Sequence, residues 1–486
     1  PNMSYNRFNI RSNIDSKISQ RLDISLNLSA SRDDRKAPAT HKVSDPDTDL
    51  WNIMYHAFRE SPLMPIRYQN GNYGLYLNEH NSVAEANLSG ESHIYNSNFQ
   101  GSAGLSYKII DGLTLKGNAS ATFNLEDVYV DQKKMDFYSV DSKEPIKSTR
   151  SMVSNQDKKS LEINLQAYLD YNKTFGKHLV KGLLGYSQIH NQYRLLKALR
   201  KDLPANNSLG EIDAGDVTTQ ETGGKSVTYA LRSVFGRINY GFDDRYLFEA
   251  NLRYDGSSRF PKHNRFGLFP SFSFGWRISE ENFFKVDFVD NLKLRASWGK
   301  VGNDAFGSAR FLYLDNISQY SVVTDSKGDH WLSPSLGYAS NGSGWGQGYK
   351  IAENYIGNKS ITWETAEKQN YGIDISLYHD LSFSFDYFVE KRKNILIIPQ
   401  TTPMIQGLPS SALPLMNDGE VKNQGFEMVL GYQKQFKNGL SVSANANFSY
   451  AKNKVLEYDE PLLGKDYAYR TRTTGFSLGQ NWGYII

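Results

Sequence analysis

The sequence predicts an all-β chain, a transmembrane antiparallel β-barrel, on the basis of alternation, composition and connection lengths. From 440 to 450 every second residue is apolar and the intervening residues are Ser or Asn, and the same alternation runs through 113–125. A period of two is that of a strand with one apolar and one polar face. About fourteen such segments recur with few helical patterns between them, which predicts a large antiparallel barrel.

The composition favours a barrel whose apolar face meets lipid. Hydrophobic residues make up 39% of the 486 residues, below the roughly 45–50% of soluble globular chains, so a filled core of this size is not expected. A wide barrel needs no thick apolar centre, because its polar residues face the lumen. Aromatic residues reach 13%, with 31 Tyr, and Tyr suits the headgroup region of a membrane.

Several classes of protein are disfavoured. No stretch of about 18 apolar residues exists, so we expect no membrane-spanning helix. The absence of Cys removes disulfide frameworks and thiolate metal sites. A net charge of +3, from 55 basic and 52 acidic residues, gives no reason to expect nucleic acid as a partner. The chain begins at Pro1 without a signal peptide, so we expect it to be part of a longer exported protein.

The expected strands are joined by alternating short and long connections. We place them at approximately 5–19, 22–34, 97–110, 113–130, 159–175, 178–200, 226–241, 244–257, 266–279, 291–302, 366–379, 381–396, 422–436 and 440–456. Asp111-Gly112 and Asn438-Gly439 are typical of tight turns. The long loops are expected at 35–96, 131–158, 201–225, 303–365 and 397–421. Short turns on one rim and long loops on the other are typical of an outer-membrane barrel, with the long loops extracellular.

The first long loop is expected to contain one helix. Asp47 is a suitable cap, and Leu50, Ile53, Met54, Ala57 and Phe58 follow with helical spacing until Pro62. The spacing of Asp45, Asp47 and Asp49 also suggests calcium, but the glycine and terminal glutamate of an EF-hand loop are absent, and acids at a helix start explain them better. We predict no metal and no cofactor.

Charged residues are expected on the face opposite the apolar one. Phe248, Ala250, Leu252 and Tyr254 share the apolar face of one strand, where Lys or Arg would cost about 2–4 kcal/mol at the bilayer midplane. The charged set comprises Lys116, Glu162, Asp170, Glu249, Arg253, Arg277, Lys293, Arg295, Asp374, Asp386 and Glu427. Its near balance favours a cargo that is neutral or of mixed charge. The alternative is that these charges pair with one another or with a plug in the lumen.

Two runs within 245–284 carry a family resemblance. The more specific parts are Asp255-Gly256-Ser257-Ser258-Arg259-Phe260 and the run from Phe269-Pro270-Ser271 to Trp276-Arg277; 292–303, Gly372-Ile373-Asp374 and 417–427 continue it. Together they resemble the SusC/RagA-type TonB-dependent outer-membrane transporters of Bacteroidetes. The resemblance covers most of the chain and marks Asp255, Gly256, Ser257, Ser258, Arg259, Phe260, Pro270 and Trp276 as hallmark residues.

This resemblance implies the rest of the functional prediction. The full protein would be a barrel of about 22 strands in the bacterial outer membrane, and 1–486 would be part of that single barrel domain, without the plug, the TonB box or the last strands after Tyr484. It would import a glycan or an oligopeptide, driven by the TonB complex, together with a SusD-like surface lipoprotein. A dimer of transporter–lipoprotein pairs is also implied.

Exposed aromatic residues of the long loops are the expected ligand contacts, because their rings stack on sugars or on peptide side chains. These residues are Trp331, Tyr338, Trp345 and Tyr349 in 303–365, with Trp51 and Tyr73 in 35–96. The alternative is that the rings pack the loops together. Two other functions remain open: a passive porin or barrel-based adhesin, and a barrel enzyme. No GxSxG or HExxH occurs, so we predict no catalytic residues.

Overall fold

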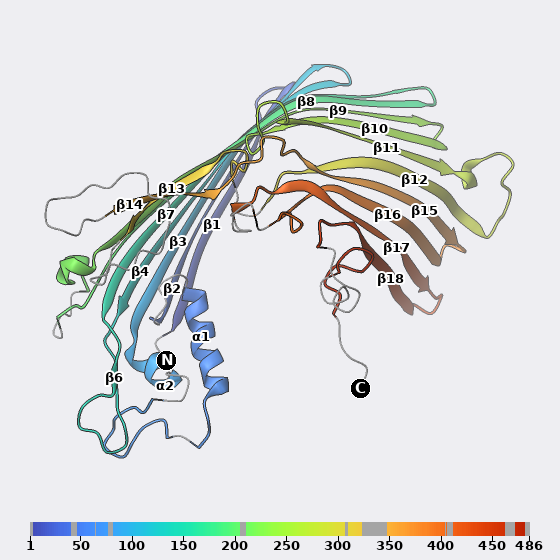
Figure 1. Cartoon of the computed structure of the whole chain (residues 1–486). Helices are drawn as coiled ribbons and strands as arrows, with labels where there is room; N and C mark the ends of the chain where they lie inside the picture. Colours follow the sequence, from blue (N-terminus) through green and yellow to red (C-terminus); the bar gives the residue numbers. More distant parts are fainter. Residues whose placement is uncertain are drawn as a thin grey trace. The chain divides into compact units, whose positions relative to one another are not determined.

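Fourteen antiparallel strands form one sheet in the computed structural model (Figure 1). The structure describes residues 3–39, 46–63, 65–75, 81–204, 210–306, 310–322, 348–403, 405, 412–461 and 472–481. The strands are β1 (Ser4–Lys17), β2 (Leu22–Pro38), β3 (Gly90–Ile110), β4 (Leu113–Gln132), β7 (Met152–Phe175), β8 (His178–Lys201), β9 (Glu221–Phe242), β10 (Tyr246–Ser257), β11 (Phe266–Arg277), β12 (Val289–Asn303), β15 (Glu364–Leu377), β16 (Leu381–Ile397), β17 (Met416–Gln435) and β18 (Ser441–Glu457). They follow one another in chain order across the sheet, which confirms the all-β antiparallel prediction.

The connections alternate between short and long along the chain, except around β11, where 258–265 has eight residues and 278–288 has eleven. The short ones join β3 to β4, β7 to β8 and β17 to β18, among others. Gly112 and Gly439 have φ values of +82° and +85°, a conformation that costs glycine nothing and suits these tight turns. The long connections contain the small elements β5 (Asp136–Phe137), β6 (Lys147–Ser148), β13 (Asn316–Val322) and β14 (Gly348–Tyr355), and the 3₁₀ helices η1 (Ile212–Ala214) and η2 (Val217–Thr219). A third, η3 (Ile278–Glu280), lies between β11 and β12.

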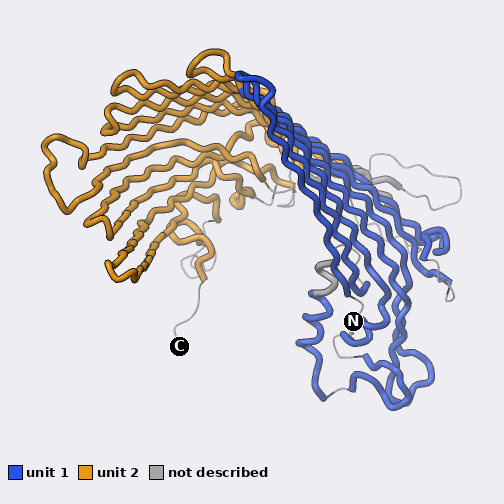
Figure 2. The backbone as a smooth tube through the Cα atoms, turned by 180° about the vertical axis from the view of Figure 1, so that it is seen from behind, with its two compact units in different colours: residues 1–107, 116–166, 188–230 blue, residues 108–115, 167–187, 231–486 orange. Residues whose placement is uncertain are grey.

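The chain divides into two compact units (Figure 2). Unit 1 comprises 1–107, 116–166 and 188–230, and unit 2 comprises 108–115, 167–187 and 231–486. In unit 1, β2 pairs with β1 on one side and with β3 on the other, the latter from Leu22↔Tyr107 to Pro38↔Glu91. The β3 strand therefore begins at Gly90, seven residues before the predicted start.

Two helices lie in the first long connection of unit 1. The predicted helix is present as α1 (Pro46–Arg59), but it begins one residue before Asp47. Proline at the first helical position has the required φ and loses no hydrogen bond, so Asp47 lies inside the first turn instead of capping it. The second helix, α2 (Ser82–Leu88), was not predicted; the Asn81 side chain caps it by accepting from the Ala84 amide. No helix in the described ranges is long and apolar enough to cross a membrane.

The apolar face of the sheet in unit 2 is exposed. In the register, Phe248 of β10 lies between Tyr240 and Phe274, and Ala250 lies between Ile238 and Phe272. These large side chains leave much of their surface uncovered, with Ile238 at 58% and Phe274 at 48%. Buried apolar residues of this unit instead form a small cluster of Phe260, Phe269, Ile361 and Trp363, at the connections and the strand ends next to them. The apolar face therefore packs against no protein core in this unit, as expected for strands that face lipid.

Candidate functional site

The polar face of unit 2 carries a closed ion-pair network around Arg295. Its guanidinium donates to Asp374 on β15, with nitrogen–oxygen distances of 2.7 and 2.9 Å, and to Asp386 on β16 at 2.9 Å. Ser384 donates to Asp374 at 2.7 Å. A Cβ on Gly372 would lie 2.7 Å from the Arg295 Cζ atom, so glycine leaves the room that the guanidinium occupies. Arg295, Asp374 and Asp386 belong to the charged set predicted for the polar face. They pair with one another, as in the second interpretation given for that set.

Hallmark residues at the end of β10 stabilise the connection that follows. Asp255 accepts from Arg253 Nε at 2.7 Å, and the buried Ser257 donates to Asp304 at 2.6 Å and accepts from the Arg259 amide. A Cβ on Gly256 would lie 2.3 Å from the Phe266 ring. Ser258 also takes part in a polar or ring contact. The motif therefore holds the connection from β10 to β11 and ties it to the segment after β12.

Phe260 ends this motif in an apolar cluster that joins residues of two connections to Phe269 on β11. It is fully buried with Ile361, beside Phe269 and Trp363, and the Phe260 and Trp363 ring centroids lie 5.1 Å apart. Trp363 also donates its indole N–H to the Arg265 carbonyl at 3.0 Å. We call Phe260, Phe269, Ile361 and Trp363 the rim cluster.

Pro270 lies where β11 parts from β12. The register between these strands begins at Ser271↔Gly299, one residue after Pro270, and proline has no N–H to continue a ladder. Beyond that point the Phe269 ring occupies the space against Gly302, whose Cβ would meet it at 2.1 Å. The rim cluster thus fills the opening between the two strands. Trp276 lies near the opposite end of β11, where it donates to Glu281 at 3.0 Å.

Asparagine side chains join the long connections of unit 2. Asn417 exchanges hydrogen bonds with the Thr362 backbone at 2.9 and 3.0 Å and donates to the Asn394 carbonyl at 2.8 Å. Asn358 donates to the Leu415 carbonyl at 2.7 Å, and Asn264 donates to the Ser360 carbonyl at 3.0 Å. Three connections are therefore held together by amides that bond to main-chain atoms.

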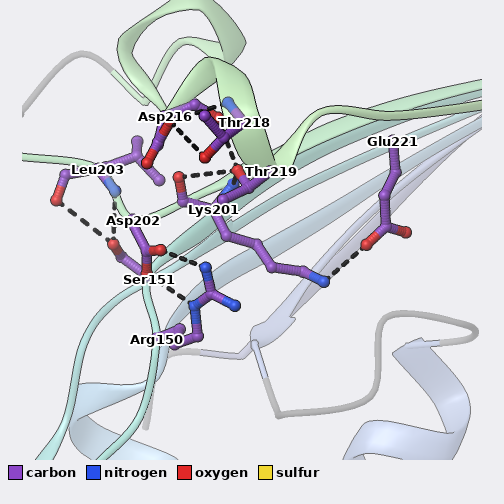
Figure 3. A network of polar contacts seen from close by, with 9 residues as sticks. All are labelled: Arg150, Ser151, Lys201, Asp202, Leu203, Asp216, Thr218, Thr219 and Glu221. Atoms are coloured by element: carbon purple, nitrogen blue, oxygen red, sulfur yellow. Dashed lines mark hydrogen bonds and ion pairs between the residues drawn. The ribbon is translucent and has the colours of Figure 1, made fainter. Parts of the chain in front are cut away.

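A separate polar network fixes the connection from β8 to β9 in unit 1 (Figure 3). Arg150 donates two hydrogen bonds to Asp202, and this partner lowers the pKa of the Asp202 carboxyl. The Leu203 amide donates to Ser151 Oγ at 2.8 Å, and Lys201 donates to Glu221 at 2.7 Å. Hydrogen bonds from the amide and hydroxyl of Thr218 lower the pKa of Asp216.

The segment after β18 folds back over the end of that strand in unit 2. Val455 donates to the Phe476 carbonyl and accepts from the Gly475 amide, both at 2.8 Å. Asn453 Oδ1 accepts from the Leu478 amide at 2.7 Å, and Glu460 accepts from the Thr473 and Thr474 amides. We call residues 473–480 the rim segment. It forms one wall of a cavity of about 520 Å³ against β16, β17 and β18.

The predicted ligand-contact residues do not form one described site. Trp331, Tyr338 and Trp345 lie outside the described residues, and Tyr349 pairs with Ser321 in the β13–β14 sheet. Trp51 on α1 is 70% exposed. Tyr73 is buried in a cluster with Ala84, Met135 and Phe137, which favours the packing alternative for that ring.

The sequence did not mark the cavity residues as ligand contacts, although 417–427 belongs to the family resemblance. Ile395 and Ile397 face it together with Glu390 and Arg392, although strict alternation places 390 and 395 on opposite faces. The reason is a pair of register shifts between Arg392 and Leu396, where Asn394 has a φ of +58°. An asparagine that interrupts an alternating run was the available signal. Among the described residues, no group of three or more His, Cys, Asp or Glu side chains is arranged to hold a metal ion.

The family model and the relatives that match this chain all carry the description of TonB-dependent receptors. The family described as TonB dependent receptor-like, beta-barrel matches residues 129–485. TonB-dependent receptor P3 of Formosa agariphila is 27% identical over 94% of this chain and 43% of its own length. TonB-dependent receptor SusC of Bacteroides thetaiotaomicron is 29% identical over 62% of this chain and 27% of its own length.

Solved structures share the fold over nearly the whole chain. The RagAB peptide importer in its closed-closed state superposes with a TM-score of 0.72 and 21% identity, covering 94% of this chain and 47% of the matched one. At this identity the likeness supports the fold alone. The chain spans less than half the length of these relatives.

Proposed function

The chain belongs to the TonB-dependent receptor-like β-barrel family, and from this premise we propose that the full-length protein imports a bulky nutrient, a glycan or an oligopeptide, across the bacterial outer membrane. The supporting observation is the family match over 129–485 in a sheet whose apolar face is exposed and whose polar face is ion-paired. Transport, not catalysis, is the proposed activity.

The proposed partners are a TonB complex and a SusD-like surface lipoprotein, in a dimer of transporter–lipoprotein pairs. The names of the relatives support the TonB complex and nutrient uptake: P3 and SusC are TonB-dependent receptors, and RagAB is a peptide importer. The lipoprotein and the dimer follow from the resemblance to SusC/RagA-type transporters. Within this chain, the braced long connections supply fixed surfaces on which a lipoprotein would dock. Exposed Trp51 is proposed as a ligand or partner contact, and Trp331, Tyr338, Trp345 and Tyr349 remain proposed ligand contacts.

A pull-down tests the proposal. The full-length transporter is isolated from native outer membranes in mild detergent, and co-eluting proteins and bound molecules are identified by mass spectrometry. We expect a stoichiometric lipoprotein and a retained glycan or peptide. Uptake of the retained molecule is then measured in cells with and without a working TonB system. Uptake at an unchanged rate without TonB would identify a passive porin instead.

A further inference from the structure

The cavity beneath the rim segment has the size of a ligand site. Its volume of about 520 Å³ lies within the roughly 300–1,000 Å³ of small-molecule pockets. The rim segment that walls it is tied to β18 by backbone hydrogen bonds at Val455 and by the Asn453 side chain. Tyr458 accepts from Gln400 at 3.3 Å, which joins the cavity to the connection after β16.

Aliphatic side chains make up the floor and much of the walls. Ile397 and Val455 are 7% and 1% exposed, and Ile395, Val421 and Leu478 complete the apolar lining. A Cβ on Gly419 would lie 3.0 Å from both Ile395 and Ile397. Glycine thus allows these side chains to pack closely over the strand.

Such a lining suits an apolar side chain better than a sugar. Sugar hydroxyls buried against Ile and Val would lack hydrogen-bond partners, at a cost of about 1–3 kcal/mol each. Among the lining residues Tyr458 alone carries an aromatic ring, so stacking on a sugar is limited. The amides of Asn423 and Asn453 offer donors and acceptors of the kind that bind a peptide backbone.

The charges at the cavity add a preference for a cation. Three carboxylates line it, those of Glu390, Glu420 and Glu457. Glu390 pairs with Arg392 and Lys368, and Glu420 pairs with Lys391 at 2.6 Å. Glu457 lies directly opposite Glu420 in the register. Within the described part of the chain, Glu457 forms no ion pair. Like charges in facing positions destabilise a strand pair, and Lys391 offsets only the charge of Glu420, so a cation bound at Glu457 would supply the second counter-charge.

We propose that this cavity binds an aliphatic, positively charged portion of an oligopeptide cargo, with the cation at Glu457 and Glu420 and the aliphatic part against Ile397 and Val455. This proposal rests on the proposed import function and assigns its cargo class. It names a peptide rich in Leu, Val or Ile with Lys, Arg or a free amino terminus, in preference to a glycan.

Binding to the purified full-length transporter tests the proposal. The probe is a fluorescein-labelled hexapeptide, Leu-Val-Lys-Leu-Val-Lys, and its counterpart carries Glu in place of Lys; fluorescence anisotropy reports both affinities, with maltohexaose as competitor. Glu457→Gln should weaken binding of the Lys peptide by about two- to fivefold, the effect of one exposed ion pair. Leu478→Trp, at an exposed wall position, should weaken it further by filling the cavity. Glu427→Gln, on β17 outside the lining, is the matched control and should change nothing.

Three results would overturn the assignment: equal affinity for the Lys and Glu peptides, displacement of the peptide by maltohexaose, or absence of Lys-peptide binding. Whole-cell uptake separates this failure from failure of the import function. TonB-dependent uptake of glycans but not of peptides would overturn the cavity assignment and leave import intact. Peptide uptake that continues at an unchanged rate without TonB would overturn TonB-driven import, while the binding measurements would still decide the cavity assignment.

Discussion

Arg295 illustrates how a single residue on the polar face depends on its partners. The guanidinium neutralises two carboxylates on neighbouring strands, Asp374 and Asp386, and all three side chains are partly buried. Arg295→Met would leave these two neighbouring carboxylates without this counter-ion. We expect the free energy of unfolding to fall by about 1–3 kcal/mol, between the values for exposed and buried pairs. Urea titration of the folded protein in detergent measures it.

A triple variant provides the control for this prediction. Arg295→Met combined with Asp374→Asn and Asp386→Asn removes the charges on both sides, so most of the lost stability should return. If the single and triple variants are equally unstable, packing of the arginine side chain, not its charge, is what matters.

The ion pair between Arg150 and Asp202 predicts a pH response in unit 1. Because the arginine lowers the pKa of Asp202 in the folded protein, the pair stabilises fully above the ordinary aspartate pKa of about 3.9 and is lost as the pH falls through the lowered value. We expect proteolytic cleavage of 202–220 to accelerate at acid pH, measured with an acid-active protease.

Asp202→Asn is the variant that isolates this effect. It should raise cleavage at neutral pH and reduce the difference between neutral and acid pH. Asp216, whose pKa is also lowered, retains a smaller response in the same direction. A pH response that is the same in both proteins would show that other groups control this connection.

At the scale of the elements, the rim cluster holds the connections around β11 and β15. Phe260→Ala removes a fully buried ring, and we expect a loss of about 3–5 kcal/mol. Hydrogen exchange should rise in 258–265 and 356–363 together. Phe272→Ala on β11 is the control, because its ring is 46% exposed on the apolar face. Faster exchange confined to 258–265 would mean that the cluster does not couple the two connections.

The elements that the sequence predicts well are those with a long, regular alternation. The strand β18 was expected at 440–456 and spans Ser441–Glu457, and β10 was expected at 244–257 and spans Tyr246–Ser257. The start of β3 lies earlier than predicted. The short helix α2 was not predicted, because its seven residues are too few to show a helical period. The β13–β14 sheet was missed as well, since it lies inside a long connection.

The candidate sites were harder to predict, for reasons visible at particular residues. The hallmark motif was recognised, but its role as a loop brace depends on partners such as Asp304 and Trp363, which are distant in sequence. The cavity depends on a bulge at Asn394 that reverses the alternation of β16. Contacts of this kind follow from register and loop packing, which a period of two does not encode.

For the molecule as a whole, the exposed apolar face predicts that the same substitution has very different costs at neighbouring positions of one strand. Leu252 is 51% exposed on that face, whereas Asn251 bonds to Glu249 and Ser271 on the polar face. Leu252→Lys should destabilise the protein in a lipid bilayer by about 2–4 kcal/mol, and Asn251→Lys should cost much less. Unfolding titrations in lipid vesicles compare them. Equal costs would mean that this face does not meet lipid.

The asparagine ties of unit 2 have a consequence for the divergence of this protein. Asn417, Asn358 and Asn264 bond to main-chain atoms of other connections, and every residue type offers the same carbonyl. The side chains of Ser360, Thr362 and Leu415, whose carbonyls accept these bonds, can therefore be exchanged by mutation without breaking the ties, provided that the backbone keeps its course. The loop backbone therefore keeps its hydrogen bonds while exposed side chains change. Mutation and selection can in this way alter what the loops bind without changing how they are held.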